Sequence, residues 1–186
     1  MRKNSNKSLK PDIFNATNSL KVLSCLADKP GNEFLGTEIA KATGISRGGV
    51  YLALKELIKQ KLACVTKRGR FFSYSIIYND SAIRQFKVLK NVLALRTIVL
   101  KLKPFSRKII LYGSYARGEN DLSSDIDLFI IAKDPIAAKE AVSAIKIRQK
   151  IQAVIKTSSE LAEFKGNEKV FMHEIDRGIA LWEEKE

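Results

Sequence analysis

Residues 113–131 read GSYARGENDLSSDIDLFII, and this stretch decides the fold of the C-terminal part of the chain. Asp125 and Asp127 lead into the apolar run 128–131, which predicts a buried strand. Side chains at i and i+2 of a strand project from the same face. Two carboxylates held this close repel each other and need a compensating cation. A hard ion with oxygen ligands, Mg²⁺, suits them best.

A Gly-Ser pair follows a second apolar run. Residues 109–112 predict another buried strand, and Gly113 and Ser114 form the turn into a helix that opens at Tyr115. A glycine lets the backbone approach a phosphate, while a serine hydroxyl and the amides of a helix N-terminus bind its oxygens. A phosphate cradle and two metal-binding carboxylates on neighbouring strands predict a site for a nucleoside triphosphate and its metal.

The pattern Gly-Ser, ten residues, Asp-x-Asp, with Ala-Arg-Gly inside the gap, resembles the minimal nucleotidyltransferases of the DNA polymerase β-like superfamily. The resemblance covers residues 105–186. It implies that Gly113 and Ser114 contact the triphosphate and that Asp125 and Asp127 are the catalytic, metal-binding pair. Mg²⁺, as one or two ions, would be the cofactor, and ATP or another nucleoside triphosphate would be the substrate.

The third carboxylate of that family is where this chain departs from the pattern. The family position falls at about Gln152, in a strand predicted over residues 150–156. A glutamine carbonyl ligates a metal weakly and cannot take a proton from an attacking hydroxyl. Three interpretations stay open. Another acid substitutes, with Glu160 and Glu163 nearest in sequence, or the substrate brings its own activation, or the domain binds nucleotide and metal without efficient transfer.

Arg117 and Ser124 lie between the two halves of the motif and are further candidates for nucleotide binding. Arg117 is expected either to bind the triphosphate or to pair with Asp121 or Asp125. The hydroxyl of Ser124 is also expected to shape the turn before the first aspartate by bonding backbone amides.

Charge is distributed unevenly along the 186 residues. The net charge of +13 divides into +8 over residues 1–80, +6 over residues 81–104 and −1 over residues 105–186. A basic part joined to a neutral part suggests a module that binds a polyanion such as nucleic acid. The alternative is that lysine-rich surfaces only keep the protein in solution.

No apolar stretch approaches the roughly 20 residues that a membrane-spanning helix needs, and the basic N-terminus is not followed by an apolar segment. We therefore expect a cytoplasmic protein without a secretory signal or membrane partner. Cys25 and Cys64 lie in apolar surroundings without metal-ligand spacing. We expect both to be small, reduced core residues.

Three helical patterns and a β-hairpin occupy residues 14–78. Apolar spacing and caps predict a helix that starts near Asn15 and stops at Pro30-Gly31, a helix over residues 38–43 capped by Thr37, and a helix capped by Ser46. Strands are predicted at residues 34–35, 62–66 and 71–76. The order of these elements is more informative than any one of them.

This order resembles a winged helix-turn-helix domain, and TEIAKATGISRGGVYLALKELIKQKLACV, residues 37–65, carries the resemblance. It implies binding to DNA, with the second helix of the motif in the major groove and the wing along the backbone or minor groove. Winged helices also serve as protein–protein or dimerisation modules, so that alternative stays open. The candidate DNA-binding residues are Arg47 as base reader, Tyr51 and Lys55 on the same helical face, and Lys67, Arg68 and Arg70 around the hairpin tip.

The predicted architecture is a two-domain α+β or α/β protein. Its apolar connecting helix is expected to bury Ile83, Phe86 and Leu89 on one side, with Lys90 largely elsewhere, and a homodimer through this apolar side is one expected assembly. The predicted parts are a basic flexible arm at 1–13, a winged helix-turn-helix domain at 14–78, the connecting helix at 79–104, and a minimal nucleotidyltransferase domain with a mixed β-sheet flanked by helices at 105–186.

Two functions follow from these patterns. The first is transfer of a nucleoside monophosphate, AMP from ATP being favoured, to a hydroxyl. Relatives with this compact domain act as antitoxins that adenylylate a partner toxin, so the resemblance implies a protein acceptor such as a cognate toxin. The second is transcription regulation, in which the C-terminal domain only senses nucleotide. A weaker third reading has the winged helix hold RNA or a protein acceptor for the transferase.

Overall fold

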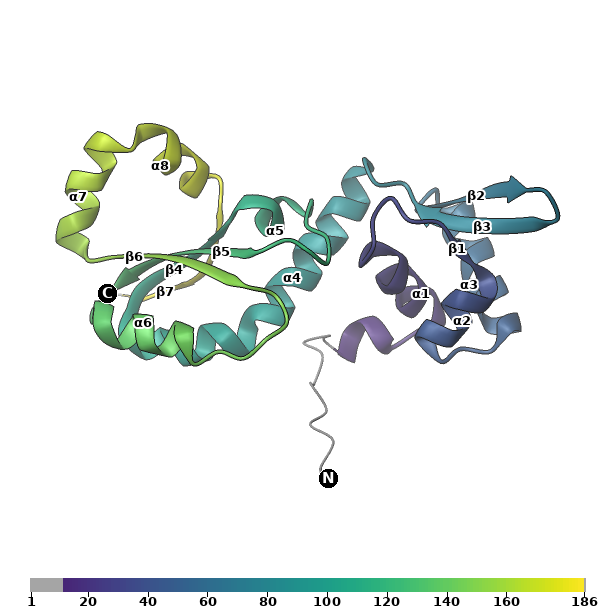
Figure 1. Ribbon diagram of the computed structural model, residues 1–186, viewed down its shortest axis with the longest axis horizontal. Helices are drawn as coiled ribbons and strands as arrows, with labels where there is room; N and C mark the ends of the chain where they lie inside the picture. Colours follow the sequence, from purple (N-terminus) through teal and green to yellow (C-terminus); the bar gives the residue numbers. More distant parts are fainter. Residues whose placement is uncertain (1–11, 186) are drawn as a thin grey trace, which may run out of the picture. The chain divides into compact units, whose positions relative to one another are not determined.

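The computed structural model describes residues 12–185, so the predicted basic arm at 1–13 lies almost wholly outside the described residues. The chain forms two compact units that divide between Lys90 and Asn91 (Figure 1). Within residues 12–185, no helix combines the length and the apolar character that crossing a bilayer requires.

The first unit consists of short helices and a small antiparallel sheet, whose strand order is β1-β3-β2. Its core is formed by side chains such as Val22, Leu26, Ile39 and Leu54 from the helices and Ile76 from the sheet. Its elements are η1 (Asp12–Asn15), α1 (Asn18–Ala27), β1 (Phe34–Leu35), α2 (Gly36–Thr43), α3 (Arg47–Lys59), β2 (Ala63–Arg68), β3 (Phe71–Ile76) and the first part of α4 (Ser81–Leu102).

Local capping explains where the helices of this unit begin. Ser46 caps α3 as predicted, because its Oγ accepts a hydrogen bond from Gly49 N at 3.2 Å. The prediction that Thr37 caps α2 is wrong, since α2 already begins at Gly36. The carboxylate of Glu38 instead accepts a hydrogen bond from Leu35 N at 2.8 Å and fixes the start of this helix.

The predicted faces of α4 are partly wrong. Ile83 is buried as expected, but Leu89 is exposed and Lys90 is buried. The ammonium of Lys90 forms an ion pair with Asp28 and donates a hydrogen bond to the carbonyl oxygen of Ser24 at 3.2 Å. A buried cation is tolerated here because it neutralises an acid and binds a carbonyl near the end of α1.

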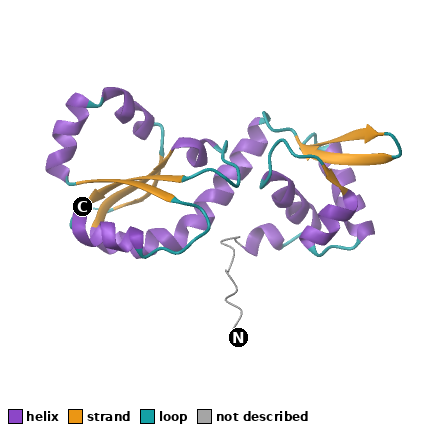
Figure 2. Ribbon diagram, viewed as in Figure 1, coloured by secondary structure: helices purple, strands orange, loops and turns teal. Residues whose placement is uncertain are grey.

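The second unit is built around a mixed four-stranded sheet of order β6-β5-β4-β7. Strands β5 and β6 are parallel and the other neighbours are antiparallel. Figure 2 draws these strands in orange. The mixed sheet is the one that the sequence predicts. After the second part of α4 come η2 (Lys103–Phe105), β4 (Ser106–Tyr112), α5 (Gly113–Arg117), β5 (Ile126–Ala132), α6 (Pro135–Ser143), β6 (Ile151–Lys156), α7 (Ser158–Asn167), α8 (Lys169–Asp176) and β7 (Ile179–Glu183).

Helices cover both faces of this sheet. Leu111 and Leu128 belong to the core formed with α4 and α6. Tyr112 and Phe129, their neighbours along the strands, pack instead with Met172 and Ile175 of α8. Since side chains alternate along a strand, Asp127 is on the α8 face of the sheet together with Phe129. This alternation places the acidic motif under the last helix.

Several predicted details of the fold differ. The helix predicted over residues 136–149 ends at Ser143, because the following segment has to return to the start of β6. Cys64 is exposed rather than part of the core, because it alternates with buried Ala63 along β2 and so lies on the opposite face, and Cys25 is half-buried. Both cysteines are free thiols, as predicted. Trp182 packs against the core of the second unit, and His173 is exposed on α8.

Candidate nucleotide and metal site

One end of the sheet brings the parts of the Gly-Ser and Asp-x-Asp motif together. Tyr112, the last residue of β4, is opposite Asp127 in the antiparallel register. Asp127 is also opposite Gln152 in the parallel register of β5 and β6. Asp125 directly precedes β5. The two aspartates, the glutamine and the turn after β4 therefore lie at one end of the sheet, and the turn and the aspartates belong to neighbouring strands as predicted.

Gly113 is fixed at this edge by two independent requirements. Its φ of +69° lies in the left-handed region, which side chains rarely adopt. A Cβ at this position would lie 2.3 Å from Oδ2 of Asp127, far inside van der Waals contact. The turn therefore needs a glycine so that the backbone and the carboxylate of Asp127 can touch.

The helix α5 that carries Ser114 is anchored from α4. The side-chain amide of Asn91, which is buried, donates hydrogen bonds to the carbonyl oxygen of Tyr115 at 2.9 Å and to Oδ1 of Asn120 at 2.8 Å. These bonds tie α5 and the loop that follows it to α4, so the backbone beside Ser114 is held by the fold itself.

The loop before Asp125 is organised by Asp121 and two serines. Oδ1 of Asp121 accepts hydrogen bonds from the backbone N of Ser123 at 2.8 Å and of Ser124 at 3.0 Å. The Ser124 hydroxyl accepts a hydrogen bond from Asp121 N at 2.9 Å, which is the turn-shaping role predicted for it. Nucleotide binding by Ser124 stays a prediction, and it requires this hydroxyl to serve the ligand in addition to the loop.

Arg117 pairs with acids that the sequence did not suggest. Its Nε donates to Oε2 of Glu119 at 2.8 Å and its Nη1 donates to Oε1 of Glu174 on α8. The predicted pairing with Asp121 or Asp125 is therefore wrong. Glu174 comes from a helix 57 residues further along the chain, so only the folding of α8 over the sheet brings it here. Triphosphate binding by Arg117 stays a prediction.

The electrostatics of the site reflect closely spaced carboxylates. The pKa of Asp127 is raised, first by burial and then by the negative charge of Asp125, while Arg117 acts in the opposite direction. Burial and the charges of Asp127 and Glu174 also raise the pKa of Tyr112. A pair of carboxylates on one face, which offers oxygen ligands, is the chemistry that fits a hard divalent cation.

Gln152 occupies the position at which the family pattern has its third acid. Its Nε2 donates a hydrogen bond to Oδ2 of Asp125, so the amide faces the pair of aspartates with its nitrogen. Glu160 is not a substitute, because it follows the opposite end of β6 and accepts hydrogen bonds from the backbone and hydroxyl of Thr157. In the described part of the chain, no three acids, histidines or cysteines gather closely enough to hold a metal ion by themselves.

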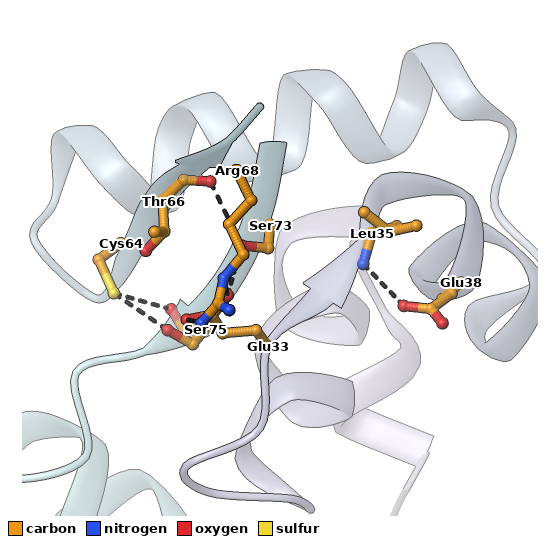
Figure 3. A network of polar contacts seen from close by, with 8 residues as sticks. All are labelled: Glu33, Leu35, Glu38, Cys64, Thr66, Arg68, Ser73 and Ser75. Atoms are coloured by element: carbon orange, nitrogen blue, oxygen red, sulfur yellow. Dashed lines mark hydrogen bonds and ion pairs between the residues drawn. The ribbon is translucent and has the colours of Figure 1, made fainter. Parts of the chain in front are cut away.

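The candidate DNA-binding residues of the first unit differ in their surroundings. Arg47, Tyr51 and Lys55 are exposed on α3, and Lys67 and Arg70 are exposed at the β2–β3 hairpin. Arg68 is engaged: its Nε and Nη2 donate to the two carboxylate oxygens of Glu33 at 2.9 and 3.0 Å (Figure 3). The hydroxyl of Ser73 joins the same carboxylate at 2.6 Å. DNA binding by all six residues stays a prediction.

Comparison with known proteins assigns the class of the second unit. Residues 97–186 match the family model described as "Polymerase beta, Nucleotidyltransferase", so this part of the chain is a nucleotidyltransferase domain. The chain is also similar to a putative protein adenylyltransferase from Methanocaldococcus jannaschii, with 46% identity over 46 residues. That similarity covers 25% of this chain and 46% of the relative, so the match spans about half of the curated relative's length.

Two residues that shape this site were missed by the sequence analysis. Glu174 would have been recognisable only from the packing of α8 against the sheet. Asn91 is a polar residue in an otherwise apolar helical pattern, and a buried polar residue in such a pattern is the kind of signal that points to a positioning role. Both act through other residues, Glu174 on Arg117 and Asn91 on the turn after β4.

Proposed function

We propose that the protein transfers a nucleoside monophosphate from a nucleoside triphosphate to a hydroxyl acceptor and releases pyrophosphate. In this reaction the acceptor oxygen bonds to the α-phosphorus and gives up its proton to water, while the bond from the α-phosphorus to the bridging oxygen breaks and that oxygen leaves with the pyrophosphate. The observation that carries the proposal is the contact of Gly113 with Asp127, with Asp125 beside it on the same edge. This contact places a glycine backbone, which a phosphate can approach closely, next to two adjacent carboxylates.

Each residue has a defined task in this proposal. Asp125 and Asp127 would hold Mg²⁺, which when bound neutralises charge on the phosphates. Gly113 and Ser114 would receive the triphosphate oxygens at the turn that Asn91 holds in place. Arg117, which Glu119 and Glu174 orient from two sides, would contact the same phosphates.

ATP as the donor and a protein hydroxyl as the acceptor are the favoured specificities. The printed name of the M. jannaschii relative, a putative protein adenylyltransferase, supports both. A partner toxin is the protein acceptor that the resemblance of the compact domain implies. The first unit would bring a DNA-binding winged helix-turn-helix, supported by its helix order, its β-hairpin and the exposed Arg47 and Lys67.

The test is covalent labelling with purified protein, ATP labelled at the α-phosphate, Mg²⁺ and cell lysate as the source of acceptors. The double variant Asp125→Ala/Asp127→Ala is the inactive control. Label on a macromolecule with the natural protein and not with the double variant supports the proposal, and mass spectrometry then identifies the acceptor and the hydroxyl. Equal labelling by both proteins would overturn it.

A second candidate function is favoured by one observation, the bond from Gln152 to Asp125. A site without a third carboxylate binds nucleotide and metal but has no evident group to accept the proton of the attacking hydroxyl. The protein would then be a transcription regulator that senses nucleotide. It would show nucleotide binding that the double variant loses, no covalent label, and a nucleotide-dependent change in affinity for DNA.

A further inference from the structure

Two adjacent phenylalanines are left in water on the β2–β3 hairpin. Phe71 is 67% exposed and Phe72 is 53% exposed, and Val65 on the facing strand is 44% exposed. Burying a side chain of this size normally contributes about 1.5–3 kcal/mol to folding. Phe71 and Phe72 therefore contribute little of this stabilisation, because both remain largely exposed. Stability of the fold does not explain why aromatic residues occupy these two positions.

The register shows that both surfaces of the hairpin tip are aromatic. Phe72 is opposite Lys67, and Phe71 is opposite Arg68. Because side chains alternate, Phe72 and Lys67 lie on the face that continues from buried Ala63 and Ile76, whereas Phe71 lies on the face of Arg68 and Ser73. The inner half of the sheet packs on the core, and its outer half presents an aromatic side chain on each face.

The charges around these rings have one sign. Residues 61–79 contain four basic and no acidic residues. Lys67 and Arg70 are exposed beside the two phenylalanines, and an acid that contacts the hairpin, Glu33, already binds Arg68 and Ser73. Two copies of this tip packed together would bring like charges into contact. The tip is complementary to a polyanion that carries flat apolar groups.

We propose that the β2–β3 hairpin binds nucleic acid with unpaired bases, which stack on Phe71 and Phe72 while Lys67 and Arg70 contact the phosphates. A phenyl ring has no donor or acceptor for reading base edges, and the faces of bases are hidden inside a duplex. Unpaired bases expose these faces, and stacking on an aromatic side chain is tolerant of sequence. This inference deepens the nucleic-acid role proposed above for the first unit and is independent of nucleotidyl transfer.

The test is fluorescence anisotropy of the full-length protein with labelled single-stranded RNA, single-stranded DNA and duplex DNA of one sequence at fixed salt. We expect Phe71→Ala/Phe72→Ala to weaken binding of the single strands by about 10-fold or more, because each stacked base contributes about 1–3 kcal/mol. Duplex binding should change by less than about 2-fold. The RNA and DNA arms identify which single strand the hairpin prefers.

Two matched variants separate stacking from other effects. Leu100→Ala removes a side chain of similar exposure, 68%, outside the hairpin, and should leave all three affinities unchanged. Lys67→Ala/Arg70→Ala should weaken single strands and duplex alike and lower the salt dependence of both. Because all these side chains are exposed, thermal unfolding should be unaltered, which confirms that the variants fold.

The remaining outcomes overturn the inference. If the protein binds duplex DNA more tightly than single strands, and Phe71→Ala/Phe72→Ala changes neither affinity, stacking is refuted. DNA binding by the first unit would still be supported. Failure to bind any of the three nucleic acids would refute both of these and leave the transferase assay unaffected. A change from dimer to monomer in the phenylalanine double variant, measured by sedimentation, would assign the tip to a second copy of the chain instead.

Discussion

Replacing Gly113 with alanine tests the contact on which the candidate site depends. The new Cβ would lie 2.3 Å from Oδ2 of Asp127. That is about 1 Å inside the roughly 3.3 Å at which carbon and oxygen normally touch. An alanine at a φ of +69° costs about 1–2 kcal/mol in backbone strain, and overpacking adds about 1–3 kcal/mol. We therefore expect Gly113→Ala to lower the free energy of unfolding by about 2–5 kcal/mol.

A double-mutant cycle with Asp127→Ala separates the two contributions. Once the carboxylate is removed, Gly113→Ala should cost only the backbone part, about 1–2 kcal/mol, which leaves a coupling of about 1–3 kcal/mol. Urea unfolding followed by the fluorescence of Trp182, the single tryptophan, reports on this sheet because Trp182 pairs with Ile109 of β4. Additive effects, with a coupling below about 0.5 kcal/mol, would refute the contact.

Gly44 provides the matched control for the backbone part. Its φ is +71°, and a Cβ there would meet nothing within 4 Å. Gly44→Ala should therefore cost about 1–2 kcal/mol and show no coupling to Asp127→Ala. It should also leave nucleotidyl transfer unchanged, whereas Gly113→Ala should abolish it, because the proposed function places the triphosphate at Gly113 next to Asp127 and not at Gly44.

Three further predictions concern single side chains. Gln152→Glu should raise Mg²⁺-dependent transfer by roughly 100-fold, because it introduces a proton acceptor. Without Mg²⁺ the variant should be less stable, because the new carboxylate repels Asp125. Unchanged transfer in the labelling assay would contradict this prediction. Asp28→Asn should cost about 3 kcal/mol in urea unfolding, because it removes the carboxylate facing buried Lys90, and a cost below about 1 kcal/mol would show that this ion pair is dispensable. The hydrogen bond from Arg68 is the main cause that lowers the pKa of Glu33 from 4.5. Glu33 therefore stabilises the hairpin above pH 4.5, and this stabilisation is lost as the pH falls through the lowered pKa. Hydrogen exchange of the hairpin amides should become faster at that pH, and in Glu33→Gln it should no longer depend on pH in this way.

Features that depend on a few neighbouring residues could be predicted from the sequence. The strand before Gly113, the strand after Asp125 and the cap at Ser46 each follow from local patterning and backbone chemistry. The capping box of Thr157 and Glu160 is of the same kind. Short-range rules therefore placed the motif on the correct elements and at one edge of the sheet.

Features that depend on packing between distant segments could not be predicted. Arg117 was assigned to acids near it in sequence, but its second partner, Glu174, is 57 residues away. The sequence also did not suggest the ion pair of Arg68 with Glu33, 35 residues earlier, and phosphate binding by Arg68 stays a prediction. Cys64 was assigned to the core because its neighbours are apolar, yet it lies on the face of β2 opposite buried Ala63, and packing against distant helices decides which face is buried. In each case the deciding partner comes from an element whose position no local pattern reveals.

The balance of charge at the site explains why binding and turnover are separate questions for this protein. Asp125 and Asp127 repel each other, and the Gln152 amide relieves part of this repulsion by donating a hydrogen bond to Asp125. To ligate a cation through oxygen, the same amide must turn its carbonyl toward the site and give up that bond. Gln152 thus stabilises the two carboxylates directly and would contribute little to a bound cation. A carboxylate there would do the reverse, which is why substitution at this one position distinguishes a transferase from a nucleotide sensor.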